Sequence, residues 1–521
     1  MGTGRVAVIG AGIGGLVAAL DLASRGLDVT VLERAGAPGG KMREVAVGGA
    51  RLDAGPTVLT MRWVFEEIFA AADASLGEHL TLRPADILAR HAWGRDERLD
   101  LFADVERSAD AIGAFAGPAE ARGFRAFCKR ARRIYSTLDH AFIRAPRPTL
   151  PGLIRGAGVR DLVGISPFTT LWRALGEHFR DPRLRQLFGR YATYCGSSPF
   201  LAPATLMLVA HVEQDGVWLV EGGMHRVAAA LARLAARQGA TFRYGVEATG
   251  IVAAGGRAAA VTLATGERVE ADAVVCNADA AAVAGGRLGR EAAGAVPAAP
   301  RSARSLSAVT WALVAETEGF PLVRHTVFFS DDYPAEFEDI LRRARLPAAP
   351  TVYVCAQDRD DRGAGVPAGG PERLLCLVNA PPTGDSHPFS PTEIARCEEQ
   401  AFGQLERCGL QVRRIPEATV ATTPADFNRL FPGTGGALYG RASHGWAASF
   451  QRPGARTRLP GLYLAGGSAH PGPGVPMAAL SGRIAAASLL ADLASTSPSR
   501  RAATPGGTWT RSATTGATGS R

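Results

Sequence analysis

Hydrophobic residues at the start of the chain change their spacing twice, which predicts a strand, a helix and a second strand. Apolar side chains at 6–9 form a short buried run, and those at 16–23 recur at helical spacing. Gly26 is predicted to close the helix. A second apolar run at 29–32 predicts a strand that ends at Glu33. This order is that of a βαβ unit.

Similar patterns later in the chain predict a return to the first sheet and then a second sheet. A helix is predicted over 227–238, and strands with Gly-rich turns over 241–277. The second sheet, expected to form the floor of a substrate chamber, is predicted from strands at 306–316, 351–357, 373–381 and 411–422, with a helix over 391–408.

The last apolar runs enclose an unusual loop. A strand at 461–465 is followed by a segment rich in Gly and Pro, and then by an Ala/Leu-rich helix from about 477 to 493. Pro476 suits the first position of that helix. Because helix N-termini carry a partial positive charge, we expect a ligand against this first turn.

Size and composition limit the class of protein. The 521 residues, 46% hydrophobic and 21% charged, fit two domains or one large one. No run of 18 or more apolar residues is free of charges or turn signals, so a membrane-spanning helix is not expected, and the N-terminal strand argues against a signal peptide. The 7 Cys are scattered without a CxxC pair, which predicts neither disulfides nor a zinc site and fits a reducing cytoplasm.

The net charge of +9 has two interpretations, a generally Arg-rich composition or attraction to an anionic surface. Residues 120–190 hold 15 Lys and Arg against 5 Asp and Glu, interleaved with aromatic residues, and 122–143 form a basic amphipathic pattern. This helix either packs on a core with a solvated basic face or lies on anionic lipid. Nucleic acid is not expected, since no recognised binding module is present.

The first turn carries a dinucleotide-binding fingerprint. Gly10 permits the tight turn, Gly12 allows close approach of a pyrophosphate, and Gly15 lets helix and strand pack closely. Glu33, at the end of the next strand, is placed to accept ribose hydroxyls, and an acid there argues against NADP. Strand, glycines, helix and acid together make the prediction much stronger than the glycines alone.

The residues that follow favour FAD over NAD. The segment RAGAPGGKMR after Glu33 contains Gly40 and Lys41, and this extension resembles that of the flavoprotein superfamily of amine oxidases and carotenoid desaturases. A second turn at Gly55 and Pro56 could bring backbone close to a flat ring.

From residue 5 to 493 the chain resembles the bacterial-type carotenoid (phytoene) desaturase family. The resemblance is carried by GAGIGGLVAAL, LDAGPTVLT, VEGGMH and GLYLAGGSAHPGPGVP. More narrowly, TVLTMRWVFEEIF, HVEQDGVWLVEGGM, GGALYGRASHGW and HPGPGVPMAALSGR are similar to the 1-hydroxycarotenoid 3,4-desaturases (methoxyneurosporene dehydrogenases) of phototrophic bacteria.

The resemblance implies an α/β fold in which two domains are interleaved. An FAD-binding Rossmann-like domain of the glutathione-reductase type, as in the amine-oxidase and desaturase superfamily, is expected from 1–84, 215–290 and 455–494. An α+β domain that holds the substrate and meets the membrane is expected from 85–214 and 291–454. Residues 495–521, rich in Ser, Thr, Arg and Gly, are predicted to be disordered.

The resemblance also implies the cofactor contacts, while no catalytic residue and no metal site are predicted. Gly467 stands where many members of the wider superfamily carry an acid. His211, His444 and His470 are interpreted as structural rather than as general bases. The implied FAD contacts are Gly10, Gly12, Gly15, Glu33, Gly40, Lys41, Gly55, Val246, Gly466, Val475, Pro476 and Met477.

The implied reaction removes a hydride from C4 of a 1-hydroxy acyclic carotenoid to flavin N5 and a proton from C3, which extends the conjugation. The protein would then mainly orient the substrate and exclude water. The expected partners are an acyclic carotenoid and an anionic membrane surface, with the protein cytoplasmic and peripherally bound to the inner membrane. The electron acceptor stays open between oxygen and a quinone.

Three further interpretations remain. A phytoene-type desaturase would share the fold and the cofactor. An amine oxidase would need an aromatic cage at the flavin, for which Tyr439 and Trp446 are the candidates. A prenyl-binding escort protein would have no FAD, which the intact set of Gly10, Gly12, Gly15 and Glu33 argues against.

Overall fold

The first layer of the fold is a parallel sheet that contains the N-terminal strand. A computed structural model describes residues 4–366 and 370–496. The sheet has five strands in the order β20-β13-β1-β2-β9, and all neighbours run parallel. They are β1 (Arg5–Ile9), β2 (Asp28–Glu33), β9 (Thr241–Tyr244), β13 (Ala273–Cys276) and β20 (Leu462–Leu464). All five come from the segments predicted for FAD binding.

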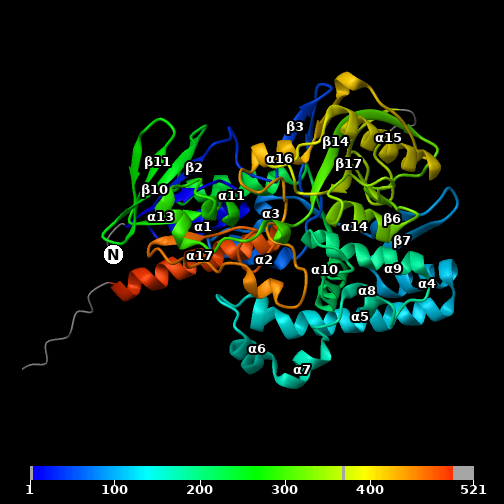
Figure 1. Ribbon diagram of the computed structural model, residues 1–521, viewed down its shortest axis with the longest axis horizontal. Coiled ribbons are helices and arrows are strands. Elements are labelled where there is room, and N and C mark those ends of the chain that lie inside the picture. The colour runs from blue at the N-terminus through cyan, green and yellow to red at the C-terminus, as the bar shows by residue number, and fades with distance from the viewer. Residues whose placement is uncertain (1–3, 367–369, 497–521) are drawn as a thin grey trace, which may run out of the picture.

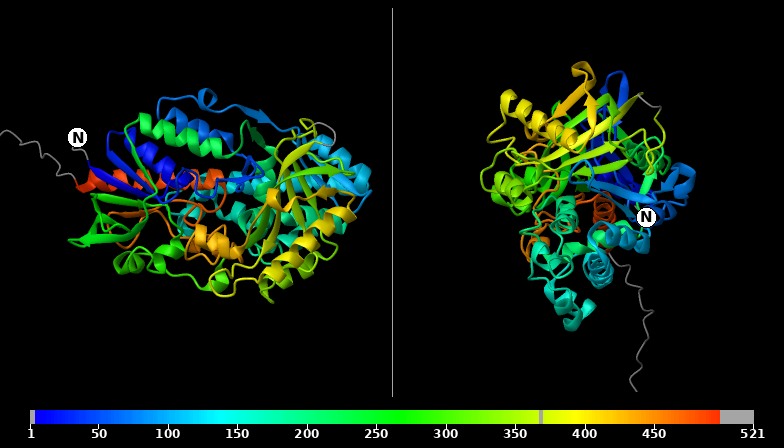
Figure 2. Two further views of the ribbon diagram at one scale, coloured as in Figure 1. Left: turned by 90° about the horizontal axis from the view of Figure 1, so that it is seen from above. Right: turned by 90° about the vertical axis from the view of Figure 1, so that its right-hand side faces the viewer.

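Three helices cover one face of this sheet (Figures 1 and 2). Every residue of α1 (Ile13–Ala23) is buried, and the helix packs against both α11 (His225–Arg237) and α17 (Val475–Thr496). Residues Val475–Ser495 are long and apolar enough to cross a membrane, but half of that stretch is buried inside the protein. Its packing on α1 accounts for the composition, because a core helix needs the same apolar side chains.

The described residues also form three smaller antiparallel sheets. β10 (Ala248–Ala254), β11 (Arg257–Leu263) and β12 (Arg268–Glu270) form the expected antiparallel meander. β3 (Glu44–Val47) and β4 (Ala50–Asp53) form a hairpin, and β5 (Leu82–Pro84) pairs antiparallel with the distant β8 (Trp218–Val220).

A mixed sheet of eight strands lies at the other end of the elongated molecule (Figure 2). Its order is β18-β14-β17-β16-β15-β6-β7, and β19 pairs with β14 outside this path. Only β6 and β15 run parallel among these pairs. The strands are β6 (Ile87–Ala92), β7 (Arg98–Phe102), β14 (Ser307–Glu318), β15 (His325–Phe328), β16 (Val352–Ala356), β17 (Pro371–Ala380), β18 (Gln411–Arg413) and β19 (Thr419–Thr422).

A layer of helices from the middle of the chain packs beside this sheet (Figure 1). The basic pattern forms α5, and its Phe124, Phe127 and Ile134 are buried in the same core as Phe188. The layer consists of α4 (Val105–Ala116), α5 (Pro118–Leu138), α6 (Leu150–Ala157), α7 (Val159–Gly164), α8 (Leu171–Leu175), α9 (Pro182–Gly189) and α10 (Leu208–Gln214).

The remaining helices connect the layers. They are α2 (Arg62–Ala70), α3 (Leu76–His79), α12 (Ala280–Ala284), α13 (Arg290–Ala295), α14 (Tyr333–Leu341), α15 (Pro391–Arg407) and α16 (Pro424–Leu430).

Several predicted boundaries were wrong. The strand predicted over 411–422 is two short strands, β18 and β19, because a single 3₁₀ turn at Pro416–Ala418 bends the chain between them. Helix α1 ends at Ala23, so Gly26 lies in the turn beyond it, with a φ of 79°. The predicted disordered tail begins too early, since α17 continues to Thr496. The rest of that tail, from 497 to 521, lies outside the described residues.

Candidate active site

A cavity of about 1110 Å³ lies between the two sheets. It extends from the start of α1 to side chains of the eight-stranded sheet and to helices α6 and α7. Of the predicted FAD contacts, Gly15 alone does not line it. The others that do are Gly10, Gly12, Glu33, Gly40, Lys41, Gly55, Val246, Gly466, Val475, Pro476 and Met477.

Glycines form a narrow cradle at one end of this cavity. A Cβ atom on Gly12 would lie 2.7 Å from Asn277 Nδ2, and one on Gly14 would lie 2.6 Å from the backbone nitrogen of Gly466. Gly15 sits behind the lining, where a Cβ would be 2.1 Å from the carbonyl oxygen of Gly10. Gly15 therefore allows the close packing of helix on strand that was predicted for it.

Glu33 lies at the edge of this cradle and is largely buried. Its Oε2 accepts a hydrogen bond from the Ala11 amide at 2.7 Å, and its Oε1 accepts one from the Ala35 amide at 2.8 Å. The Val246 amide donates to the Glu33 carbonyl at 3.0 Å, which brings Val246 beside it. The carboxylate keeps lone pairs for a ligand, since each oxygen can accept more than one hydrogen bond.

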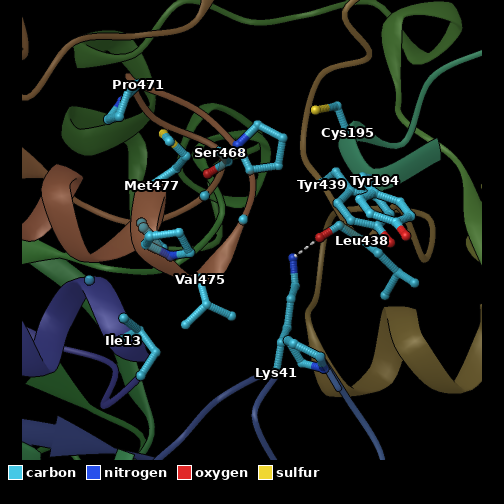
Figure 3. A pocket seen from close by; sticks show the side chains of 18 of the residues that line it. Ile13, Lys41, Tyr194, Cys195, Leu438, Tyr439, Ser468, Pro471, Val475 and Met477 are labelled. Atoms are coloured by element: carbon cyan, nitrogen blue, oxygen red, sulfur yellow. Dashed lines mark hydrogen bonds between the residues drawn. The ribbon is translucent and has the colours of Figure 1, made fainter. Parts of the chain in front are cut away.

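Lys41 crosses the middle of the cavity, where Figure 3 shows its side chain reaching toward Leu438. Its Nζ donates to the Leu438 carbonyl at 2.5 Å, and burial lowers the pKa of the amine. Gly55 packs on the same segment so tightly that a Cβ would lie 1.8 Å from the Lys41 carbonyl oxygen. Gly40, with a φ of 58°, allows the loop to fold back over Gly12.

The start of α17 forms the opposite wall of this end (Figure 3). Val475 is the first residue of the helix, so Pro476 takes the second position rather than the predicted first one. Gly474 precedes the helix with a φ of 113°, a backbone conformation that favours glycine. The helix N-terminus therefore faces the cavity with its backbone amides and partial positive charge.

Three polar residues of this end were missed by sequence reasoning. Asn277 Oδ1 accepts from the Gly15 amide at 2.6 Å, and Asp279 lines the cavity two residues later. Arg452 is buried and donates to the carbonyls of Tyr439 at 3.1 Å and Gly467 at 3.3 Å, and burial lowers its pKa to about 10. The position of Asn277 at the end of a predicted strand was a usable signal, whereas Arg452 has none.

Beyond Lys41 the cavity becomes mostly hydrocarbon. Its walls in this part come chiefly from the end of α5, the π-helical turn after it (Asp139–Ile143), the turn before α10 and α10 itself. They contribute Leu138, Phe142, Leu206, Val209 and Val212. Such a lining binds a long apolar molecule and excludes water from it.

The far end of this apolar part opens at α6 and α7. Phe168 and Val163 line the cavity while 77% and 71% exposed, and Ile154 is 47% exposed. Trp446 is 44% exposed and meets Phe168 edge-on, with ring centroids 5.4 Å apart. We call these four residues the apolar mouth.

Each histidine singled out from the sequence has a structural contact. His444 Nε2 accepts from the Ser198 amide at 3.0 Å, and His470 Nε2 lies 2.9 Å from the Ala145 carbonyl. Burial lowers the pKa of each of these two imidazoles to about 4, which keeps them neutral. His211 packs edge-on against Tyr135.

The aromatic pair considered for an amine-binding cage is divided between two settings. Tyr439 lines the cavity next to Leu438, the partner of Lys41, whereas Trp446 belongs to the apolar mouth.

Within residues 4–366 and 370–496, there is also no group of three His, Cys, Asp or Glu side chains that could hold a metal ion.

Comparison with known proteins gives consistent results over nearly the whole chain. Residues 13–490 match the family described as flavin containing amine oxidoreductase. The chain is 58% identical to a hydroxyneurosporene desaturase of Rubrivivax gelatinosus, over 99% of this chain and 98% of that protein. It is 48% identical to a protein of the same name from Cereibacter sphaeroides, over 95% of this chain and 99% of that protein.

A solved structure shares the fold at low sequence identity. A triple mutant of putrescine oxidase superposes with a TM-score of 0.58, at 16% identity, over 94% of this chain and 99% of that one. The predicted fold class, an α/β FAD-binding domain interleaved with an α+β domain, is confirmed by this likeness and by the matching family.

Proposed function

The chain belongs to the flavin-containing amine oxidoreductase family and, within it, to the carotenoid desaturases, and from this premise we propose that it introduces the C3–C4 double bond into 1-hydroxylated acyclic carotenoids. The observation that carries the proposal is one cavity that joins a glycine cradle for FAD to a long hydrocarbon-lined chamber. The desaturation itself is FAD-dependent.

The residues of the cradle fit FAD. Gly12 and Gly14 leave no room for side chains at the start of α1, so backbone amides can approach a pyrophosphate. Glu33 would bind the ribose of the ADP half, and the start of α17 would face the flavin. When bound, FAD would supply the acceptor for the hydride that leaves C4.

The chain's own contribution to the reaction is positioning and the exclusion of water. Leu206, Val209 and Val212 would hold the polyene straight in an environment without competing solvent. A cation that develops at C4 is delocalised over the polyene, so proton loss from C3 needs no strong base. This agrees with His444 and His470, which are neutral and held by backbone contacts.

We propose that the apolar mouth faces the membrane. A carotenoid is dissolved in lipid, and exposed apolar side chains that also line a substrate cavity are suited to receive it. Arg155 and Arg160, on α6 and α7, are exposed beside the mouth and would favour an anionic leaflet.

Within the basic region 120–190, the membrane proposal rests on α6, α7 and Phe168 rather than on α5. Phe124 and Phe127 of α5 are in the core, and part of its basic face is paired, as Arg133 is with Asp161 at 3.0 Å. We further propose that binding occurs on the cytoplasmic face of the inner membrane, where a reducing compartment would keep the seven cysteines as thiols.

Conversion of purified substrate tests the proposed reaction. The FAD-loaded protein, supplied with a 1-hydroxylated acyclic carotenoid in liposomes, is expected to give a product two hydrogen atoms lighter that absorbs at longer wavelength. Recovery of unchanged carotenoid, with peroxide released from added amines instead, would show that the chain is an amine oxidase on the same fold.

A further inference from the structure

The cavity is polar where it meets the eight-stranded sheet, opposite in character to its apolar mouth. Four strands of the sheet contribute polar side chains to the lining, although a site for a pure hydrocarbon would need none of them. We call this surface the polar floor; its members are Thr310 on β14, His325 on β15, Tyr353 on β16 and Asn379 on β17.

His325 is the member of the polar floor with an unused polar atom. The side chain is 3% exposed, and its Nδ1 lies 2.8 Å from Tyr353 Oη. Its Nε2 is buried and has no hydrogen-bond partner anywhere in residues 4–366 and 370–496. Because a buried polar atom without a partner costs stability, such an atom at a cavity wall indicates a ligand.

The orientation of this imidazole is held by a chain of hydrogen bonds. Tyr353 Oη lies 2.7 Å from Thr57 Oγ1 on its other side, and the rings of His325 and Tyr353 stack with centroids 6.2 Å apart. Burial and the charge of Arg324 lower the pKa of His325 to about 3, so the ring is neutral. One ring nitrogen of a neutral imidazole donates and the other accepts.

We propose that His325 Nε2 binds the terminal hydroxyl group of the substrate, with Tyr353 as the residue that positions the imidazole. This inference rests on the proposed function and adds to it the residue that selects hydroxylated carotenoids. A tertiary alcohol both donates and accepts, so it complements Nε2 in either tautomer, whereas an end group of pure hydrocarbon would leave the atom without a partner.

The position of the polar floor suits the chemistry of the substrate. The hydroxyl group at C1 is only three carbon–carbon bonds from C4, so its partner must lie near the bound flavin. Thr57, which holds Tyr353, follows two residues after Gly55, and Gly55 packs on Lys41 in the cofactor cradle. The polyene then extends from the flavin toward the apolar mouth.

A second buried atom without a partner provides the matched control. Ser307 Oγ, on β14, is likewise buried without a hydrogen-bond partner among the described residues, but Ser307 does not line the cavity. It therefore carries the same kind of unpaired polar atom as His325 at a place that a ligand in the cavity does not contact.

The test is a competition between two carotenoids of equal chain length, one with and one without the 1-hydroxyl group, for the FAD-loaded enzyme in liposomes. The ratio of kcat/KM for the two substrates measures hydroxyl selectivity. For His325→Phe, which keeps a flat ring beside Tyr353, we expect that ratio to fall about tenfold, the loss of roughly one hydrogen bond. His325→Gln, which restores a donor and an acceptor, is expected to recover part of it.

The remaining variants decide the outcome. Tyr353→Phe is expected to lower the selectivity by a smaller factor, and Ser307→Ala to leave it unchanged, with full FAD occupancy in both. Unchanged selectivity in His325→Phe, or an equal loss in Ser307→Ala, would overturn the inference. If the wild-type enzyme converted both substrates equally, the hydroxyl site would be refuted while desaturation stood, and conversion of neither would refute the proposed function itself.

Discussion

Glycine residues shape the cradle end of the cavity because they have no side chain. At Gly12, Gly14 and Gly55 an added Cβ would come within 2.7 Å, 2.6 Å and 1.8 Å of neighbouring atoms, distances that real side chains do not tolerate. Gly14 and Gly55 are therefore required by close backbone packing, and Gly12 by the Asn277 side chain, even before a cofactor binds. Glu33 is the charged residue of the fingerprint, and it makes the most direct residue-level prediction.

Glu33→Gln is expected to weaken FAD binding by about 1.5–3 kcal/mol, the range for hydrogen bonds to a charged group. The amide keeps the size of the side chain, but only its oxygen can accept from the Ala11 or Ala35 amides and the ribose. Titration of the apoprotein with FAD, followed by flavin fluorescence, measures the change.

Glu247→Gln is the matched control, since Glu247 also lines the cavity but its side chain is 56% exposed. Equal affinity for FAD in the Glu33 variant and the wild type would remove Glu33 from the ribose site.

Residues with a local motif could be predicted at this scale, and residues without one could not. The fingerprint glycines and Glu33 stand at fixed spacings, because one βαβ unit brings them together. His325 and Tyr353 lie on ordinary strands, and only the register of β15 and β16 places their side chains beside Thr57, far away in the sequence. Arg452 likewise reaches Tyr439 and Gly467 through loops whose path no periodicity reveals.

At the scale of elements, the packing of α17 on α1 links the two ends of the chain. A Cβ on Gly482 would lie 2.3 Å from the Gly14 carbonyl oxygen, so the two helices touch through their backbones. The same contact keeps the N-terminus of α17 directed at the cavity. The apolar residues predicted both helices. The contact between them depends on two glycines 468 positions apart, and no pattern in the sequence indicates that these two residues meet.

Gly482→Ala is expected to lower the free energy of unfolding by about 1–3 kcal/mol, the usual cost of overpacking, because a backbone carbonyl cannot rotate away. Denaturant unfolding monitored by circular dichroism measures this loss.

Gly403→Ala in α15 is the control, since its nearest atom would be Arg407 Nη1 at 3.8 Å and the exchange there is expected to stabilise the helix. A Gly482 variant as stable as the wild type would mean that α1 and α17 are not in backbone contact.

At the scale of the whole molecule, the cavity joins three different environments. The glycine cradle lies between the two sheets, the polar floor lies on the eight-stranded sheet, and the apolar mouth opens at α6 and α7. The order of elements along the chain was predictable, because strands and helices alternate with clear turn signals. The mouth was not, since α6 and α7 are short and their apolar residues look like those of any small helix.

Membrane binding through the apolar mouth is expected to depend on a few side chains. Phe168→Asp and Val163→Asp should each reduce binding to both neutral and anionic vesicles, because a charge cannot enter the apolar layer. Arg155→Gln combined with Arg160→Gln should reduce binding to anionic vesicles only, by about 1 kcal/mol for each charge. Flotation at low and high salt measures both effects.

Ile415→Asp is the control, since Ile415 is 52% exposed but does not line the cavity. Equal loss of binding in this variant would show that exposed apolar residues in general, and not the mouth, contact lipid.

The most direct test of the account is one turnover in the absence of oxygen. The FAD-loaded protein is mixed with one equivalent of a 1-hydroxylated acyclic carotenoid, and the flavin and carotenoid absorption bands are followed together. We predict that the flavin band bleaches at the same rate as the carotenoid band moves to longer wavelength, with one double bond formed for each flavin reduced. A carotenoid that changes while the flavin stays oxidised, or a flavin that no carotenoid reduces, would contradict hydride transfer as the function of this cavity.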